Sequence, residues 1–343
     1  MPLDGLPPPT GFRWLADTAA QGGFGVQIFF LISGFCIGVR ARHDWEGQAG
    51  GGQFLIDRLI RIVPVYYAAF GLMLFWGILF FPLSQSQWFS TSEAPGVFPA
   101  NPLDLLRILT LTEIFSDRFP LLRVSWTLSA ELSYYLLVSI GLSLSRLTRR
   151  PELLVAAGFA LALATAALPA DNPTSFASSA VSGWRHFICG FLVSCTLLRP
   201  SLKPPLKALA ISGIVLLGLV SWHQDPSYWR GWMPAVLAFV LLCLHPIDGW
   251  IARQTTLQWL QSCGVVSYSL YLIHDPIVSR LCRLALRFPE LPRPLLFAVP
   301  LIAIAGALIA AHIFFRFIEM RVELWRKGRR RTRHTELTLS PAT

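Results

Sequence analysis

The sequence has few charged residues and lacks the common motifs of soluble enzymes. Charged residues make up 14% of its 343 positions, whereas a soluble domain carries roughly a quarter. It has no GxSxG elbow, HExxH pair, phosphate-binding loop or dinucleotide-binding glycine motif in the context that each requires. Its six cysteines show no CxxC spacing, so neither a zinc site nor a disulfide framework is indicated. The chain therefore lacks the usual signatures of a soluble enzyme, and we predict no metal site.

Long apolar runs make up most of the chain. Hydrophobic residues account for 54% of the positions and the mean hydropathy is +0.53. Runs of about 17–25 apolar residues recur, which is the length that crosses a hydrocarbon core about 30 Å thick. The sequence therefore predicts an all-α fold, a polytopic transmembrane helical bundle. About nine predicted spans lie near 24–39, 62–82, 124–144, 152–169, 181–198, 207–222, 232–247, 264–281 and 294–318.

Basic residues indicate how these spans are oriented. Lys and Arg cluster after spans one, three, five and nine, and only the loop with Arg283, Arg287 and Arg293 departs from this pattern. The positive-inside rule therefore places these clusters and the C-terminus in the cytoplasm. The basic residues that orient the spans in the membrane account for the net charge of +10, so we predict no nucleic-acid partner. The long external loop at 83–122 contains a segment, Leu103 to Phe115, that we expect to form a short interfacial helix.

This topology divides the chain into three parts. They are an external segment at 1–22, a membrane domain at 23–320 and a basic cytoplasmic tail at 321–343, which we expect to be disordered after Trp325. An odd number of spans with a cytoplasmic tail requires an external N-terminus. Residues 1–22 contain no apolar region that would act as a signal sequence. We therefore expect a further span upstream of these residues.

Two segments place ionisable side chains inside predicted spans, where such groups are costly and are candidates for function. Glu131 lies in the third span among several hydroxyl residues, and its carboxylate could take a proton from a hydroxyl or orient a histidine. His274 is followed by Asp275 and Pro276, and a proline tends to kink a helix and free a carbonyl group. The alternatives are a structural ion pair or hydrogen bond for Glu131, and a buried, satisfied histidine for His274.

Two arginines precede the second apolar run. Arg58 and Arg61 are three residues apart, so they share one face of a helix that begins before Pro64. A guanidinium group suits phosphate oxygens because it donates two parallel hydrogen bonds. The alternative is that both arginines only orient the span.

Six segments in order along the chain carry further short motifs. They are GV-x-x-FF-x-x-SGF within 24–38, R-x-x-R-x-x-P-x-Y at 58–66, Ser125 to Glu131, Arg185 to Gly190, Tyr268 to His274 and Arg316 to Glu319. Together they resemble the landmarks of the acyltransferase-3 family of integral membrane O-acyltransferases. The family's first span has an Arg followed eleven residues later by a His, but here Phe24 stands at that spacing from Arg13.

The resemblance implies a protein of ten spans in the cytoplasmic (inner) membrane. Such a protein would move an acyl group, often acetyl in the family, from acyl-CoA (acetyl-CoA) to a hydroxyl of a carbohydrate or lipid-linked glycan acceptor. By this resemblance Arg58 and Arg61 serve the acyl-CoA side, and Glu131 and His274 belong to a polar cavity. The histidine that removes the hydroxyl proton would lie on the span upstream. Two other interpretations are a glycan or lipid transporter that uses Glu131 and His274 as a proton relay, and an inactive homologue of the enzyme.

Overall fold

The regular structure of the described residues is helical. The computed structural model describes residues 24–47, 49–84, 102–112, 122, 124–168, 176–198, 202–224, 233–251, 253–286 and 293–339. Its main helices are α2 (Phe24–Glu46), α3 (Gly51–Ser84), α4 (Pro102–Thr110), α5 (Ser125–Leu147), α6 (Glu152–Ala167), α7 (Phe176–Leu198), α8 (Pro204–Gln224), α9 (Met233–Leu244), α11 (Gln258–Leu286), α12 (Arg293–Phe314) and α13 (Met320–Leu339). Short helical turns are η4 (His245–Ile247), α10 (Asp248–Ile251), η5 (Thr255–Leu257) and η6 (Phe315–Glu319).

Each predicted span falls on helical structure over nearly all of its described residues, and the all-α prediction is confirmed. Among the described residues, five helical stretches are long and apolar enough to cross a membrane: Gly25–Glu46, Gly51–Phe75, Ser125–Leu147, Pro204–His223 and Ala298–Arg329. Two shorter apolar helices, Glu152–Ala167 and Ala235–Trp250, accompany them. A polytopic membrane fold is therefore established, and the number of nine spans stays a prediction.

Two predictions outside the spans have different outcomes. The helix α4 forms inside the segment where we expected a short helix, and its leucines 103, 105, 106 and 109 are exposed.

The prediction of a disordered tail was wrong, because α13 continues to Leu339. Ion pairs of Glu323 with Arg326 at 2.7 Å and with Lys327 at 3.7 Å stabilise this helix at the three- and four-residue spacing that brings side chains together.

The helices form two compact units. The first comprises Met1–Phe54 and Ser133–Gly249, and the second comprises Leu55–Leu132 and Trp250–Thr343. The long helices α3 and α5 contribute residues to both. Each unit is described by itself below.

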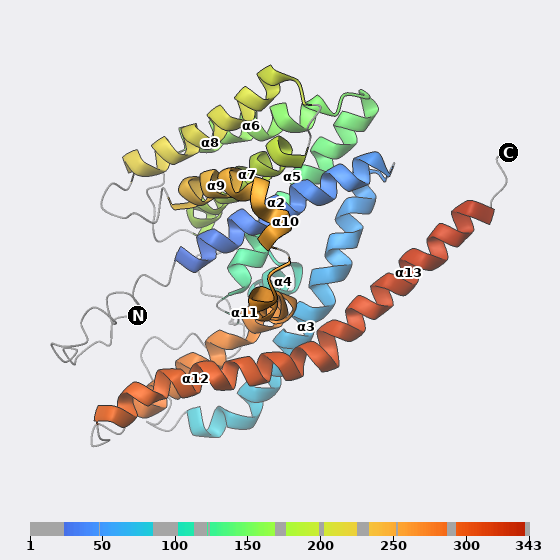
Figure 1. Ribbon diagram of the computed structural model, residues 1–343. Coiled ribbons are helices and arrows are strands. Elements are labelled where there is room, and N and C mark those ends of the chain that lie inside the picture. The colour runs from blue at the N-terminus through green and yellow to red at the C-terminus, as the bar shows by residue number, and fades with distance from the viewer. Residues whose placement is uncertain are drawn as a thin grey trace. The chain divides into compact units, whose positions relative to one another are not determined.

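The first unit is built on the close packing of α2 against α7 (Figure 1). A Cβ atom added at Gly34 would lie 2.0 Å from the carbonyl oxygen of Phe187, and one added at Gly190 would lie 1.9 Å from that of Leu31. The two backbones therefore touch, as small residues allow between membrane helices. Phe30 fills the space beside this contact, with its ring centroid 4.6 Å from that of Phe187. The glycines of two motif segments are thus explained by helix packing.

In the second unit, α11 packs along α12. The helices α12, η6 and α13 follow one another without a break and form the long red helix of Figure 1. Tyrosine hydroxyls hold α4 against α3: Tyr66 donates to the carbonyl of Ile108 at 3.1 Å, and Tyr67 donates to that of Leu109 at 2.5 Å. The second unit contains most of α3, the first part of α5, and the whole of α4, α11, α12, η6 and α13.

Candidate active site

Polar side chains of α5 and α11 meet inside the second unit. The hydroxyl of Tyr271 on α11 is hydrogen-bonded to the hydroxyl of Thr127 on α5. Glu131, one turn further along α5 than Thr127, is only 6% exposed, and the Thr127–Tyr271 contact brings this part of α5 against α11. The structure thus brings Glu131 to the part of α11 that carries His274.

The ring of His274 is held by its own helix. Its Nδ1 atom lies 3.0 Å from the carbonyl oxygen of Leu270 and 2.9 Å from that of Tyr271. Both partners are acceptors, so Nδ1 must carry the proton and donate it. The neutral ring then has its lone pair on Nε2. The side chain is half-buried, and its ring centroid lies 6.0 Å from that of Tyr271. This arrangement leaves a nitrogen base next to the Tyr271–Glu131 group.

A second polar contact joins α11 to the end of η6. Ser269, which is fully buried, donates to the Glu319 carboxylate at 2.5 Å. Glu319 is the last residue of η6, a π-helical turn, and such turns occur frequently at functional sites. The charge of Arg61 acts on Glu319 and on Glu323. Two of the motif segments therefore meet through Ser269 and Glu319, with Arg61 nearby.

The two arginines predicted to bind the donor have different surroundings. Both lie on α3 in the second unit, the unit that contains Glu131 and His274. Arg58 is 8% exposed and its neighbour Asp57 is 7% exposed, whereas Arg61 is exposed. Of the two, Arg61 is therefore the residue whose guanidinium group is open to a ligand.

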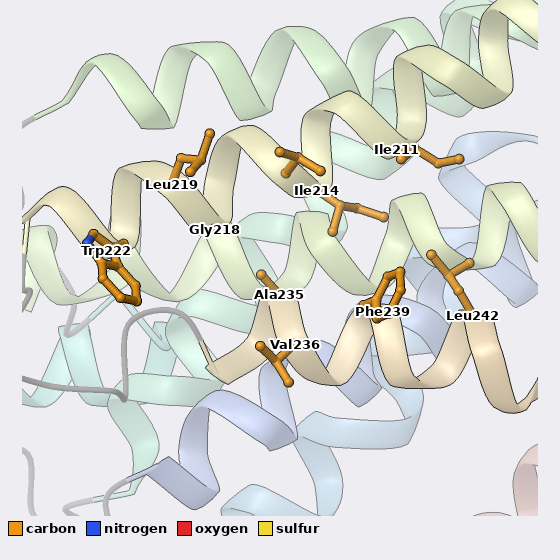
Figure 2. Close-up of a pocket in the computed structure, with 10 residues that line it drawn as sticks. Ile211, Ile214, Gly218, Leu219, Trp222, Ala235, Val236, Phe239 and Leu242 are labelled. Atoms are coloured by element: carbon orange, nitrogen blue, oxygen red, sulfur yellow. The ribbon is translucent and has the colours of Figure 1, made fainter.

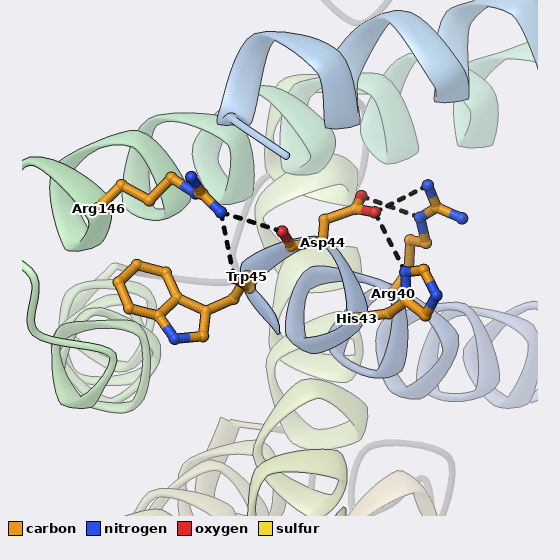
Figure 3. Close-up of polar contacts among 5 residues, drawn as sticks. All are labelled: Arg40, His43, Asp44, Trp45 and Arg146. Atoms are coloured by element: carbon orange, nitrogen blue, oxygen red, sulfur yellow. Dashed lines mark hydrogen bonds and ion pairs between the residues drawn. The ribbon is translucent and has the colours of Figure 1, made fainter. Parts of the chain in front are cut away.

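A polar cluster in the first unit lies at the end of α2 (Figure 3). The buried carboxylate of Asp44 accepts hydrogen bonds from Arg40 at 2.8 and 2.9 Å. The guanidinium group of Arg146 donates to the carbonyl oxygens of Asp44 at 3.3 Å and Trp45 at 3.1 Å. It also lies 5.6 Å from the centroid of the Trp45 ring. Because a cation that caps the final carbonyls stabilises a helix, we interpret this cluster as structural.

Arg185, the first residue of another motif segment, is also structural. It is only 4% exposed. Its Nε and Nη2 atoms donate to the carbonyl oxygen of Thr165 at 3.1 and 2.7 Å, and Nη2 also donates to that of Leu168 at 2.8 Å. The guanidinium group therefore caps the C-terminal end of α6.

A groove between α8 and α9 is unsuited to polar chemistry (Figure 2). It is lined by apolar residues, among them Ile214, Trp222, Val236 and Phe239. Apolar outer surfaces are what helices that meet lipid tails present. The groove contributes no ionisable group, so the polar residues of the second unit remain the candidate site.

Sequence reasoning missed three members of this site. Tyr271, Ser269 and Glu319 stand in segments that were singled out as motifs, yet none was assigned a role. The sequence feature that could have identified Tyr271 is its three-residue spacing from Tyr268, about one helical turn. No pattern of local spacing connects Ser269 with a carboxylate 50 residues away.

Comparison with known proteins places the chain in a family. A family model described as an acyltransferase domain matches residues 3–315. The chain is 26% identical over 338 residues to peptidoglycan O-acetyltransferase OatA of Listeria monocytogenes, which covers 90% of this chain and 52% of that protein. It is 26% identical over 275 residues to exopolysaccharide production protein ExoZ of Rhizobium meliloti, covering 75% of this chain and 77% of that one.

The chain thus spans about half the length of the Listeria relative. No solved structure matches it. The family model extends over most of the chain, and it includes the helices that carry Glu131 and His274. The chain belongs to the acyltransferase-3 family of membrane acyltransferases.

Proposed function

We propose that this protein is a membrane-bound O-acyltransferase that moves an acetyl group from acetyl-CoA to a hydroxyl of a polysaccharide or lipid-linked glycan. Family membership supports the reaction class, and the names of the two relatives support a polysaccharide acceptor. The observation that carries the proposal is the contact between α5 and α11 in the second unit, where Tyr271, three residues before His274, is hydrogen-bonded to Thr127, one turn before Glu131. The protein lies in the inner membrane, with its C-terminus in the cytoplasm.

The chemistry requires a base for the acceptor hydroxyl. The hydroxyl oxygen attacks the thioester carbonyl carbon, a C–O bond forms, and the C–S bond breaks. The hydroxyl proton passes to a base and then to the departing thiolate, which leaves as free coenzyme A. The resemblance implied a base on a span upstream, and we assign this role instead to His274: its Nδ1 donates to backbone carbonyls, so Nε2 is the atom that can receive this proton. Glu131 lies one turn along α5 from Thr127, which contacts α11 at Tyr271, and we assign its carboxylate to stabilising the imidazolium that forms.

The acyl-CoA donor needs cationic groups for its phosphates. Arg61 is exposed on α3 and belongs to the same unit as His274. The carboxylates of Glu319 and Glu323 lie close enough for electrostatic interaction with Arg61. Arg58 is buried, so we propose that its side chain packs α3 against its neighbours beside the donor site and does not contact the donor.

The test is acetyl transfer by the full chain in proteoliposomes. Radiolabelled acetyl-CoA is the donor, and isolated peptidoglycan and exopolysaccharide are the acceptors. Loss of a positioned base lowers a rate by about 10²–10⁴-fold, so we expect His274→Gln to lower kcat by at least about 100-fold. Arg61→Met should raise KM for acetyl-CoA more than it lowers kcat. His312→Gln is the matched control because His312 is an exposed histidine on α12.

Equal activity of His274→Gln and His312→Gln would refute the assignment of the base. The transporter interpretation predicts a different result. It requires that glycan movement across the vesicle membrane persists when acetyl-CoA is omitted, and that Glu131→Gln abolishes it.

A further inference from the structure

The first unit contains a small polar pocket where α2 ends and where α6 and α8 begin. Its volume is about 250 Å³, below the roughly 300–1,000 Å³ of most small-molecule pockets, so a small polar group fits it best. Its lining combines charged, aromatic and apolar side chains: Arg42, Trp45, Glu46, Pro151, Glu152, Leu202, Lys203 and Leu206.

The pocket lies at the ends of membrane helices. Gly25–Glu46 and Pro204–His223 are both long and apolar enough to cross a bilayer, and the pocket is lined by the last residues of the first and by residues at the start of the second. The ends of spanning helices lie at the depth of the lipid headgroups. Tryptophan is enriched at that depth, and Trp45 is half-buried in the pocket wall. The expected ligand is therefore part of a lipid.

The charges of the lining are of both signs. Arg42 and Glu46 neutralise each other in an ion pair of 2.7 Å. Lys203 and Glu152 make no side-chain ion pair with any residue in the described part of the chain. The pocket thus offers one ammonium group and one carboxylate to a ligand. A purely anionic headgroup would meet the carboxylate of Glu152, and a purely cationic one would meet Lys203.

We propose that this pocket binds the zwitterionic headgroup of phosphatidylethanolamine. Its phosphate pairs with the ammonium group of Lys203, which directly precedes α8; because α8 begins with Pro204 and Pro205, which have no backbone N–H, the Lys203 side chain supplies the positive charge. Its ammonium group donates hydrogen bonds to Glu152 and contacts the Trp45 ring. The methylated ammonium of phosphatidylcholine has no N–H to donate, so the pocket selects ethanolamine over choline. Leu202 and Leu206 face the glycerol end of the lipid.

The test is lipid retention by the full chain, measured by native mass spectrometry. The protein is reconstituted in vesicles with equal amounts of phosphatidylethanolamine, phosphatidylcholine and phosphatidylglycerol, then extracted in mild detergent. We expect phosphatidylethanolamine to be retained at least fivefold over the other two. Lys203→Met and Glu152→Gln, both at non-core positions, should each lower that retention at least fivefold.

Arg150→Ala is the matched control because Arg150 is exposed and adjoins the pocket without lining it. It should retain phosphatidylethanolamine as the unmodified chain does. Preferential retention of phosphatidylglycerol, equal retention of all three lipids, or unchanged retention by both pocket variants would overturn the proposal. Helical circular dichroism of each variant shows that a loss of lipid is not a loss of fold.

Discussion

Replacing Arg185 by Met tests whether this motif residue is structural. The substitution removes the donors that Nε and Nη2 provide to the carbonyl oxygens of Thr165 and Leu168. Arg185 is 4% exposed, and its bonds to the Thr165 carbonyl are buried, so water does not readily replace them. A buried acceptor left without a partner costs about 1–3 kcal/mol. Leu168 is exposed, so water can replace the donor to its carbonyl. We expect Arg185→Met to lower the free energy of unfolding by about 2 kcal/mol.

The measurement is equilibrium unfolding of the purified protein in mixed micelles of increasing SDS content, followed by circular dichroism. Arg150→Ala is the control, because Arg150 is exposed and exposed substitutions change stability by about 0.5 kcal/mol or less. Arg185→Lys separates charge from geometry. An ammonium group lacks the planar fork of arginine, so it should recover only about half of the loss.

A loss below about 1 kcal/mol for Arg185→Met would refute the capping role, since it is less than the cost of one unpaired acceptor. Complete recovery by Arg185→Lys would show that charge, rather than the paired hydrogen bonds, is what α6 requires.

Three further substitutions test other contacts. In the same SDS titration, Gly190→Ala should destabilise the protein by about 1–3 kcal/mol or more, because the added Cβ would lie 1.9 Å from a backbone oxygen of α2. Gly25→Ala is the control: its Cβ would meet nothing within 4 Å, so stability should change little. Arg149→Gly should stabilise it by about 1 kcal/mol, because Arg149 has a φ of 55° after the end of α5; unchanged stability would contradict this. Tyr271→Phe should lower kcat for acetyl transfer about tenfold or more without changing KM for acetyl-CoA, and an unchanged kcat would remove Tyr271 from the site.

The sequence identified several members of the candidate site, but not their contacts. Glu131 and His274 were recognisable because a charged or titratable residue in an apolar run is costly. Their connection through Tyr271 depends on how α5 and α11 are rotated about their axes, and no local pattern specifies that rotation. The pair Arg58 and Arg61 shows the same limit: three-residue spacing placed both on one helix, and packing left only Arg61 exposed.

The sequence by itself determined that this chain is a helical membrane protein, and five of its predicted spans overlap helices that are long and apolar enough to cross a membrane in the described part of the chain. Length and apolar composition decide membrane insertion, because each backbone polar group in the bilayer must be satisfied within its own helix. Tertiary structure alone decided which motif residues are structural. Gly34, Gly190 and Arg185 serve helix contacts, and Ser269 finds Glu319 across 50 residues. Such contacts depend on the approach and rotation of packed helices, which are set by side chains far apart in the chain.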